Sequence, residues 1–63
     1  GEEWAVYQQV LGQLQHEYAD VIIQSDKYKN ATDDERAKLL KKAYSKASED
    51  AKEQYVKEKY NLN

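Results

Sequence analysis

The residues with the clearest chemical potential are His16, Glu17 and Asp20, which lie close together in the chain. On a helix, His16 and Asp20 would share a face and could together bind a metal ion weakly. Glu17 and Asp20 would form a pair of carboxylates on one helical turn. Two ligands do not complete a metal site, and acid–base catalysis requires a cleft that separates two pKa values. We therefore interpret these side chains as a solvated helix face and predict no metal site.

Nucleophilic catalysis is also disfavoured by the placement of hydroxyl and base residues. Ser25, Ser45 and Ser48 have no base within helical reach, and the chain holds a single His. There is no Cys and no glycine-rich phosphate loop. The sequence therefore predicts a protein that is not an enzyme, with no catalytic residue, no cofactor and no small-molecule substrate.

The length of 63 residues predicts a single domain spanning residues 1–63. A chain of this size buries only about 60% of the surface that it exposes when unfolded, so its stability is marginal. With no Cys for disulfides, the remaining sources of stability are oligomerisation, a partner or very good helix packing. The net charge of −2 argues against a general nucleic-acid or membrane-surface binder. Apolar runs such as Val21-Ile22-Ile23 are far too short to span a bilayer, so we expect no membrane-spanning helix and a cytoplasmic location.

Two helices are expected, because the chain has no Pro and is rich in Ala, Lys, Glu, Gln and Leu. The first covers residues 3–24, where apolar residues recur at alternating spacings of three and four. That stripe comprises Trp4, Tyr7, Leu11, Leu14, Tyr18 and Val21. The second covers residues 32–58 and opens with a capping box, in which Thr32 and Glu35 bond each other's backbone amide. Its inner stripe comprises Ala37, Leu40, Tyr44, Ala47, Ala51 and Tyr55.

The polar connector at residues 25–31 is short, which makes the two helices antiparallel neighbours. We therefore predict an all-α fold, an antiparallel two-helix hairpin that could dimerise into a four-helix bundle. Large residues of the first helix then oppose small residues of the second, which allows close approach. The predicted pairs are Ile22–Ala37, Tyr18–Leu40, Leu14–Tyr44, Leu11–Ala47, Tyr7–Ala51 and Trp4–Tyr55. Ion pairs are expected at Asp34–Lys38 and Glu53–Lys57.

A second face of the first helix carries small residues. Ala5, Gly12 and Ala19 recur every seven residues, with Ile23 beside them. A Gly inside a helix costs about 1 kcal/mol relative to Ala, so something should offset it. One interpretation is a groove in which another helix packs closely, from a second copy or from a larger parent protein. The other interpretation is a tolerated exposed Gly.

The charge is distributed unevenly between the two helices. Residues 1–26 contain acidic side chains but no Lys or Arg, whereas residues 27–46 are rich in Lys. The candidate patch for an anionic partner comprises Lys27, Lys29, Lys38, Lys41, Lys42 and Lys46. Nucleic-acid recognition favours Arg and aromatic contacts in a contiguous patch, and this chain has one Arg, Arg36. An ordinary solvated helix surface is the competing interpretation.

Residues 25–36, S-D-K-Y-K-N-A-T-D-D-E-R, carry a resemblance that continues into Leu40, Tyr44, Ala47, Ala51 and Lys52 and includes Tyr7, Leu11, Gly12 and Gln13. This pattern resembles helical hairpin segments in very large multidomain proteins of tailed bacteriophages and related mobile elements. The resemblance implies a structural or packing segment, virion-associated if phage-derived, and identifies no functional residue. In shape alone, the expected hairpin also resembles the small dimeric RNA-binding hairpins of plasmid copy control, although an acidic first helix departs from what RNA binding requires.

These observations predict a structural or protein-interaction module that binds its own copy or the helices of a parent protein. Its working surface would be the small-residue face of Ala5, Gly12, Ala19 and Ile23. The first alternative is a small nucleic-acid-binding dimer that uses the Lys-rich loop end. The second is a stand-alone or designed mini-protein with no function beyond folding. Ionic strength distinguishes the protein-interaction module from the nucleic-acid-binding dimer, because nucleic-acid binding weakens steeply as the salt concentration rises.

Overall fold

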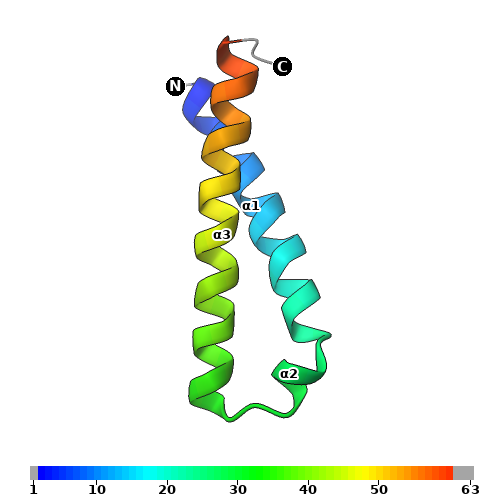
Figure 1. Ribbon diagram of the computed structural model, residues 1–63. Coiled ribbons are helices and arrows are strands. Elements are labelled where there is room, and N and C mark those ends of the chain that lie inside the picture. Colours follow the sequence, from blue (N-terminus) through cyan, green and yellow to red (C-terminus); the bar gives the residue numbers. More distant parts are fainter. Residues whose placement is uncertain (1, 61–63) are drawn as a thin grey trace.

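A computed structural model describes residues 2–60 of the chain as three helices. They are α1 (Glu2–Ile23), α2 (Asp26–Lys29) and α3 (Asp33–Tyr60), and the described residues contain no strand. The all-α class and the antiparallel hairpin of α1 and α3 are therefore confirmed (Figure 1). The predicted bounds of the long helices differ from the observed ones by one or two residues. The helical turn α2, inside the expected polar connector, was not predicted.

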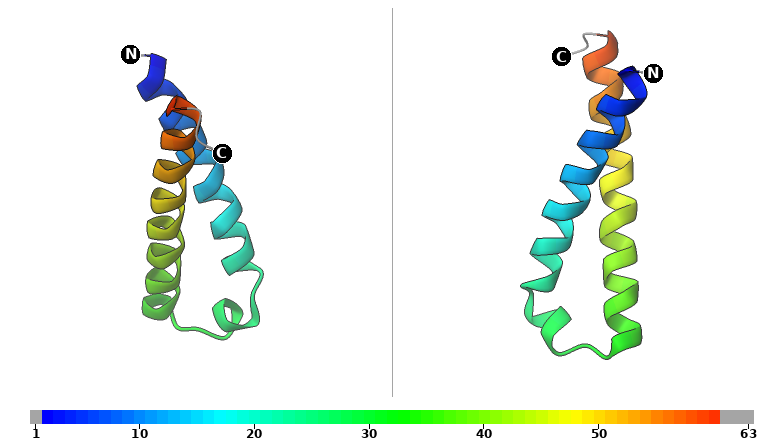
Figure 2. Two further views of the ribbon diagram at one scale, coloured as in Figure 1. Left: turned by 45° about the horizontal axis from the view of Figure 1, so that its top comes forward. Right: turned by 180° about the vertical axis from the view of Figure 1, so that it is seen from behind.

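The two long helices lie close together near the start of α1 and splay apart toward α2 (Figure 2). The Cα atoms span 42 × 24 × 14 Å, so the hairpin is a single layer of helices. A single layer has two broad faces, and within residues 2–60 no further element covers either of them.

Local side-chain bonds place the helix ends. Ser25 caps α2, because its Oγ accepts a hydrogen bond from the backbone N–H of Tyr28 at 3.2 Å. The same hydroxyl donates to the backbone carbonyl of Ile22 at 2.6 Å, where α1 ends. The predicted capping box of α3 is confirmed: the Glu35 amide donates to Thr32 Oγ1 at 3.3 Å, and the Thr32 amide donates to Glu35 Oε1 at 3.4 Å.

The connector is held to α3 by Arg36. Its guanidinium donates to the backbone carbonyls of Tyr28 and Lys29, both at 3.0 Å, and lies over the Tyr28 ring at 5.0 Å from the centroid. The carbonyls at the end of a helix lack intrahelical partners. The bond to Lys29 supplies one, and the Tyr28 carbonyl accepts both Arg36 and the Ala31 amide, the latter at 3.2 Å. Arg36 thereby fixes α2 beside the first turns of α3.

The core between the helices consists of alanines. Ala43, Ala47 and Ala51 of α3 and Ala19 of α1 are buried, and Ala47 and Ala51 have no exposed surface. No large side chain among the described residues is fully buried. Small side chains at the contact let the two helix backbones approach closely. Each of these alanines buries only a small apolar surface area.

Several residues predicted to face the partner helix are instead exposed. Trp4 is 63% exposed and Val21 is 70% exposed, so their predicted places in the core are wrong. On α3, Ala37 is exposed and Tyr44 is 44% exposed, whereas Ala43, which was not predicted, is buried. Val21 is exposed at the end where the helices splay, whereas Trp4, at the close end, stacks on Tyr7 of its own helix.

The predicted pairing is displaced by about one helical turn along α3. Tyr7, expected opposite Ala51, packs edge-on against Tyr55 with ring centroids 5.8 Å apart. Tyr18, expected opposite Leu40, lies beside Ala43 and bonds Asp50. The reason is α2, which lies beyond the end of α1 beside the first turns of α3 and so shifts α3 along α1 (Figure 1). Of the two predicted ion pairs, Glu53–Lys57 forms at 3.2 Å, and Asp34–Lys38 is not among the pairs within residues 2–60.

Candidate interaction surfaces

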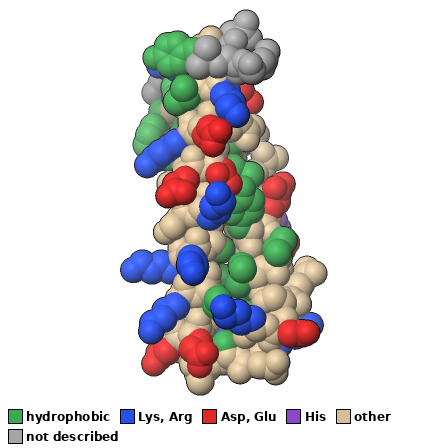
Figure 3. All heavy atoms as spheres, viewed as in Figure 1, with side chains coloured by type: hydrophobic (Ala, Val, Ile, Leu, Met, Phe, Trp, Pro, Cys, Tyr) green, Lys and Arg blue, Asp and Glu red, His purple; other side chains and the backbone are tan. Residues whose placement is uncertain are grey.

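An apolar groove opens between α1 and α3 where the helices splay, and we call it the open-end groove. Tyr18, Val21 and Ile22 of α1 form one wall, and Leu39 and Ala43 of α3 form the other. Lys42 and Lys46 of α3 also line it. On the face shown in Figure 3, apolar side chains follow the seam between the two helices, with Lys side chains along α3. The groove therefore combines an apolar floor with one basic edge.

The sequence does not predict this groove. It predicts Tyr18, Val21 and Ile22 for the contact between the helices and does not include Leu39 in the inner stripe of the second helix. Val21 is exposed, whereas Tyr18 does reach α3 through its bond to Asp50. The available signal was the spacing of Leu39 and Ala43, which are four residues apart and so share a face beside the expected stripe. Leu39 and Ala43 reach the groove because α3 presents a wider apolar face than α1 can cover once the helices diverge.

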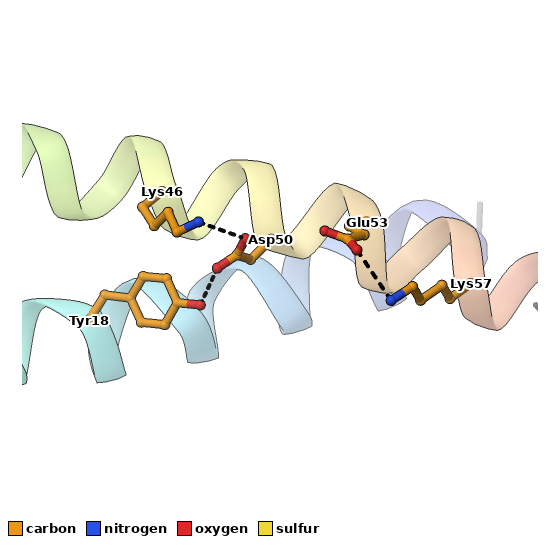
Figure 4. A network of polar contacts seen from close by, with 5 residues as sticks. All are labelled: Tyr18, Lys46, Asp50, Glu53 and Lys57. Carbon is orange, nitrogen blue, oxygen red and sulfur yellow. Dashed lines mark hydrogen bonds and ion pairs between the residues drawn. The ribbon is translucent and has the colours of Figure 1, made fainter. Parts of the chain in front are cut away.

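A polar cluster adjoins this groove, where two of its lining residues, Tyr18 of α1 and Lys46 of α3, meet Asp50 (Figure 4). The Tyr18 hydroxyl donates a hydrogen bond to Asp50 Oδ2 across the two helices, and Lys46 Nζ lies 3.6 Å from Asp50 Oδ1. The bond to the Asp50 carboxylate raises the pKa of Tyr18, with partial burial and the carboxylate charge acting in the same direction. Asp50 thus receives one neutral donor from α1 and one cation from its own helix.

The predicted small-residue face lies on a different side of α1. Gly12, Ala19 and Ile23 line a shallow hollow that is completed by Tyr44 of α3, while Ala5 is exposed outside it. Ala19 is buried within the hairpin, so it offers little accessible surface. A Cβ added at Gly12 would meet no atom within 4 Å. Packing within the hairpin therefore does not require Gly at this position.

The six lysines of the candidate anionic patch do not form one surface. Lys27, Lys38 and Lys42 come together around a hollow at the loop end, which Glu35 and Leu39 also line. Lys46 belongs to the open-end groove and pairs with Asp50. The two others, Lys29 and Lys41, are exposed and line neither hollow. Three of the six predicted lysines therefore lie together, and Glu35 lies among them.

His16 and Asp20 lie together as the spacing predicted, with Nε2 and Oδ2 3.5 Å apart. Both side chains are well exposed, at 80% and 55%. Residues 2–60 contain no group of three or more His, Cys or acidic side chains arranged to hold a metal ion. The pair therefore has the geometry of a surface ion pair, which forms when the imidazole is protonated.

Aromatic residues gather at the end of the hairpin remote from α2. Trp4 stacks on Tyr7 with ring centroids 5.5 Å apart, and the Tyr55 hydroxyl donates to Glu3 Oε2 at 3.2 Å. Lys59 Nζ lies 3.1 Å from the same carboxylate oxygen. The bond and charge of Lys59, with help from Tyr55, lower the pKa of Glu3, and Glu3 raises the pKa of Lys59. This cluster ties the beginning of α1 to the last turns of α3.

Comparisons with protein-family models, curated proteins and solved structures found no match to the chain. Among residues 2–60, no helix combines the length and apolar character that crossing a bilayer requires.

Proposed function

We propose that the chain is a non-enzymatic helical module that binds another helical surface, and that it belongs to a larger phage-encoded protein. The observation that carries the interaction role is the open-end groove, whose lining is apolar apart from the amines of its two lysines and the Tyr18 hydroxyl. The resemblance of residues 25–36 and the following helix to hairpin segments of large phage proteins supports the parent.

The energetics of the isolated hairpin support the same role. The described part of the chain buries only alanines fully, while Val21, which lines the open-end groove, remains 70% exposed. Burying one Val or Ile side chain stabilises the folded state by about 1.5–3 kcal/mol. This is a large share of the total free energy of unfolding of so small a domain. A helix seated against the groove would supply that burial without any change in the fold.

Val21 allows a direct test, because it lines the groove and contributes little to the hairpin. We expect Val21→Gln to keep the helical circular dichroism spectrum and to weaken association in sedimentation equilibrium. The matched control is Val56→Gln, because Val56 is 44% exposed on α3 and lies outside the groove. Both variants are measured alone and with a synthetic amphipathic helical peptide rich in Leu and Glu. If the wild-type chain neither self-associates nor binds this peptide, the proposal fails.

A nucleic-acid-binding role is the second candidate, supported by the meeting of Lys27, Lys38 and Lys42 at the loop end. Such binding would depend on phosphate contacts and would weaken steeply as salt rises. Fluorescence anisotropy with a short labelled RNA duplex at several salt concentrations tests it. Binding that is strong at low salt and is lost in Lys38→Gln would favour this candidate over helix packing.

A further inference from the structure

The two walls of the open-end groove differ in charge as well as in sequence. On α1, Glu17 precedes Val21 by one helical turn, so its carboxylate lies on the same side of the helix as a residue that lines the groove. On α3, Lys42 and Lys46 line the groove directly. The groove is therefore bordered by an acidic side chain on its α1 wall and by basic side chains on its α3 wall.

Two arrangements would place a second copy face to face with this groove around a two-fold axis. If the axis runs along the helices, each α1 lies over the partner's α3 and both loops lie at the same end. If the axis runs across the helices, each α1 lies over the partner's α1 and the loops lie at opposite ends. The first arrangement brings unlike walls together, whereas the second brings like walls together.

From the charge pattern we propose that a second copy of this chain occupies the open-end groove in the first arrangement, with Glu17 of one copy beside Lys42 of the other. A two-fold axis along the helices keeps each residue at its own height along the bundle. Lys42 lines the groove together with Tyr18, the chain neighbour of Glu17, so Glu17 and Lys42 lie at similar heights. The second arrangement would instead place acidic α1 against acidic α1. This inference rests on the proposed function and names its partner.

The rest of α1 is compatible with this pairing. Farther from the loop, the groove face of α3 carries acidic side chains, Asp50 and Glu53, which are already paired with Lys46 and Lys57. The part of the partner's α1 that would lie over them is residues 4–15, which contain no charged side chain. The first arrangement therefore creates attraction near the loops and no like-charge contact farther along.

A charge exchange tests the arrangement. Lys42→Glu and Glu17→Lys each place like charges in both symmetric contacts of a homodimer. We expect sedimentation equilibrium at low ionic strength to show self-association weakened by roughly tenfold in each variant. An equimolar mixture of the two variants restores opposite charges at both contacts, so we expect its association to return to within about threefold of the wild type.

The matched controls are Lys41→Glu and Asp20→Lys, which change the net charge equally on residues outside the groove. Because all four positions are exposed, circular dichroism should show the hairpin intact in every variant. Controls that weaken association as much as the groove variants, or a mixture that fails to recover, would overturn the inference. A wild-type chain that stays monomeric while binding the Leu- and Glu-rich peptide would also overturn it, although the proposed helix-binding function would stand.

Discussion

The Tyr18 hydroxyl of α1 donates a hydrogen bond to the Asp50 carboxylate of α3, so this bond links the two long helices directly. On the other side of Asp50, Lys46 supplies an ion pair within α3 at 3.6 Å. Tyr18 also lines the open-end groove, so the bond joins the α1 wall of that groove to α3.

Tyr18→Phe removes the hydroxyl and keeps the ring in the wall of the groove. We expect the free energy of unfolding to fall by about 1 kcal/mol, the usual net contribution of one hydrogen bond. Urea denaturation followed by circular dichroism measures it. The control is Tyr44→Phe, because the Tyr44 hydroxyl makes no hydrogen bond to another described residue. Equal losses in both variants would mean that the cross-helix bond adds no stability.

The same bond predicts a pH dependence at the alkaline end. The pKa of Tyr18 is raised in the folded hairpin above its ordinary value of 10.0, because Asp50 accepts a bond from the neutral phenol. The contribution to stability is therefore complete below pH 10.0 and is lost as the pH rises through the folded-state pKa. We expect the difference in unfolding free energy between the wild type and Tyr18→Phe to shrink over that range. A difference that stays constant would contradict the assignment.

Ala47 tests the alanine contact. It has no exposed surface, so Ala47→Leu must push α1 and α3 apart, and we expect a loss of about 1–3 kcal/mol in the free energy of unfolding. The control is Ala37→Leu on the same helix, where the side chain is exposed and the change should stay within about 0.5 kcal/mol. Urea denaturation compares the two. Comparable losses in the two variants would restore the inner stripe that the sequence predicted, because that stripe placed both Ala37 and Ala47 against the first helix.

Gly12 separates hairpin stability from association. A Cβ at this position meets open space, so Gly12→Ala should raise the free energy of unfolding of the monomer by about 1 kcal/mol through helix propensity. Thermal unfolding at low concentration measures that gain. If another helix packs closely on Gly12, the same variant should associate more weakly in sedimentation equilibrium. Unchanged association would leave Gly12 as a tolerated residue on an exposed face.

Arg36 tests how the connector is held. Arg36→Gln removes both bonds to the carbonyls of Tyr28 and Lys29 and the cation over the Tyr28 ring, for a loss of about 1–3 kcal/mol. We expect faster amide hydrogen exchange in residues 25–31, with exchange around Ala47 less affected. Lys41→Gln is the control, since Lys41 is exposed and lies outside both hollows that contain lysines. Exchange that speeds up equally throughout α3 would show global destabilisation instead.

The hairpin could be predicted from the sequence because its signals are local. The capping box at Thr32 and Glu35 and the three–four spacing of apolar residues act within a few turns, and the structure confirms the helices that they define. The inner faces could not be predicted equally well. Val21 fits an ideal heptad, but the heptad assumes helices that stay in contact, and these helices diverge toward the loop end. Trp4 fits it too, but at the close end its ring stacks on Tyr7 of the same helix.

The candidate surfaces depended on information that no short window contains. Leu39 and Ala43 line a groove only because α2 shifts α3 by one turn along α1 and because α1 and α3 splay apart toward α2. Ala19, expected on an outer face, is instead buried within the hairpin. The spacing of His16 and Asp20 did predict their proximity, because both residues lie on one helix. Contacts within a helix were thus accessible to sequence reasoning, and contacts between helices were accessible only approximately.

The alanine core has a consequence for how uniquely the hairpin is aligned. Ala43, Ala47 and Ala51 repeat every four residues, close to one helical turn, so sliding α1 by a turn would set the same small side chain against it again. Packing alone therefore leaves neighbouring alignments nearly degenerate. One alignment is selected by specific polar contacts, namely Tyr18 with Asp50, Glu3 with Lys59, and Arg36 with the connector. In this chain, apolar contacts hold the two helices together, and a few polar bonds determine which residues of α1 lie opposite which residues of α3.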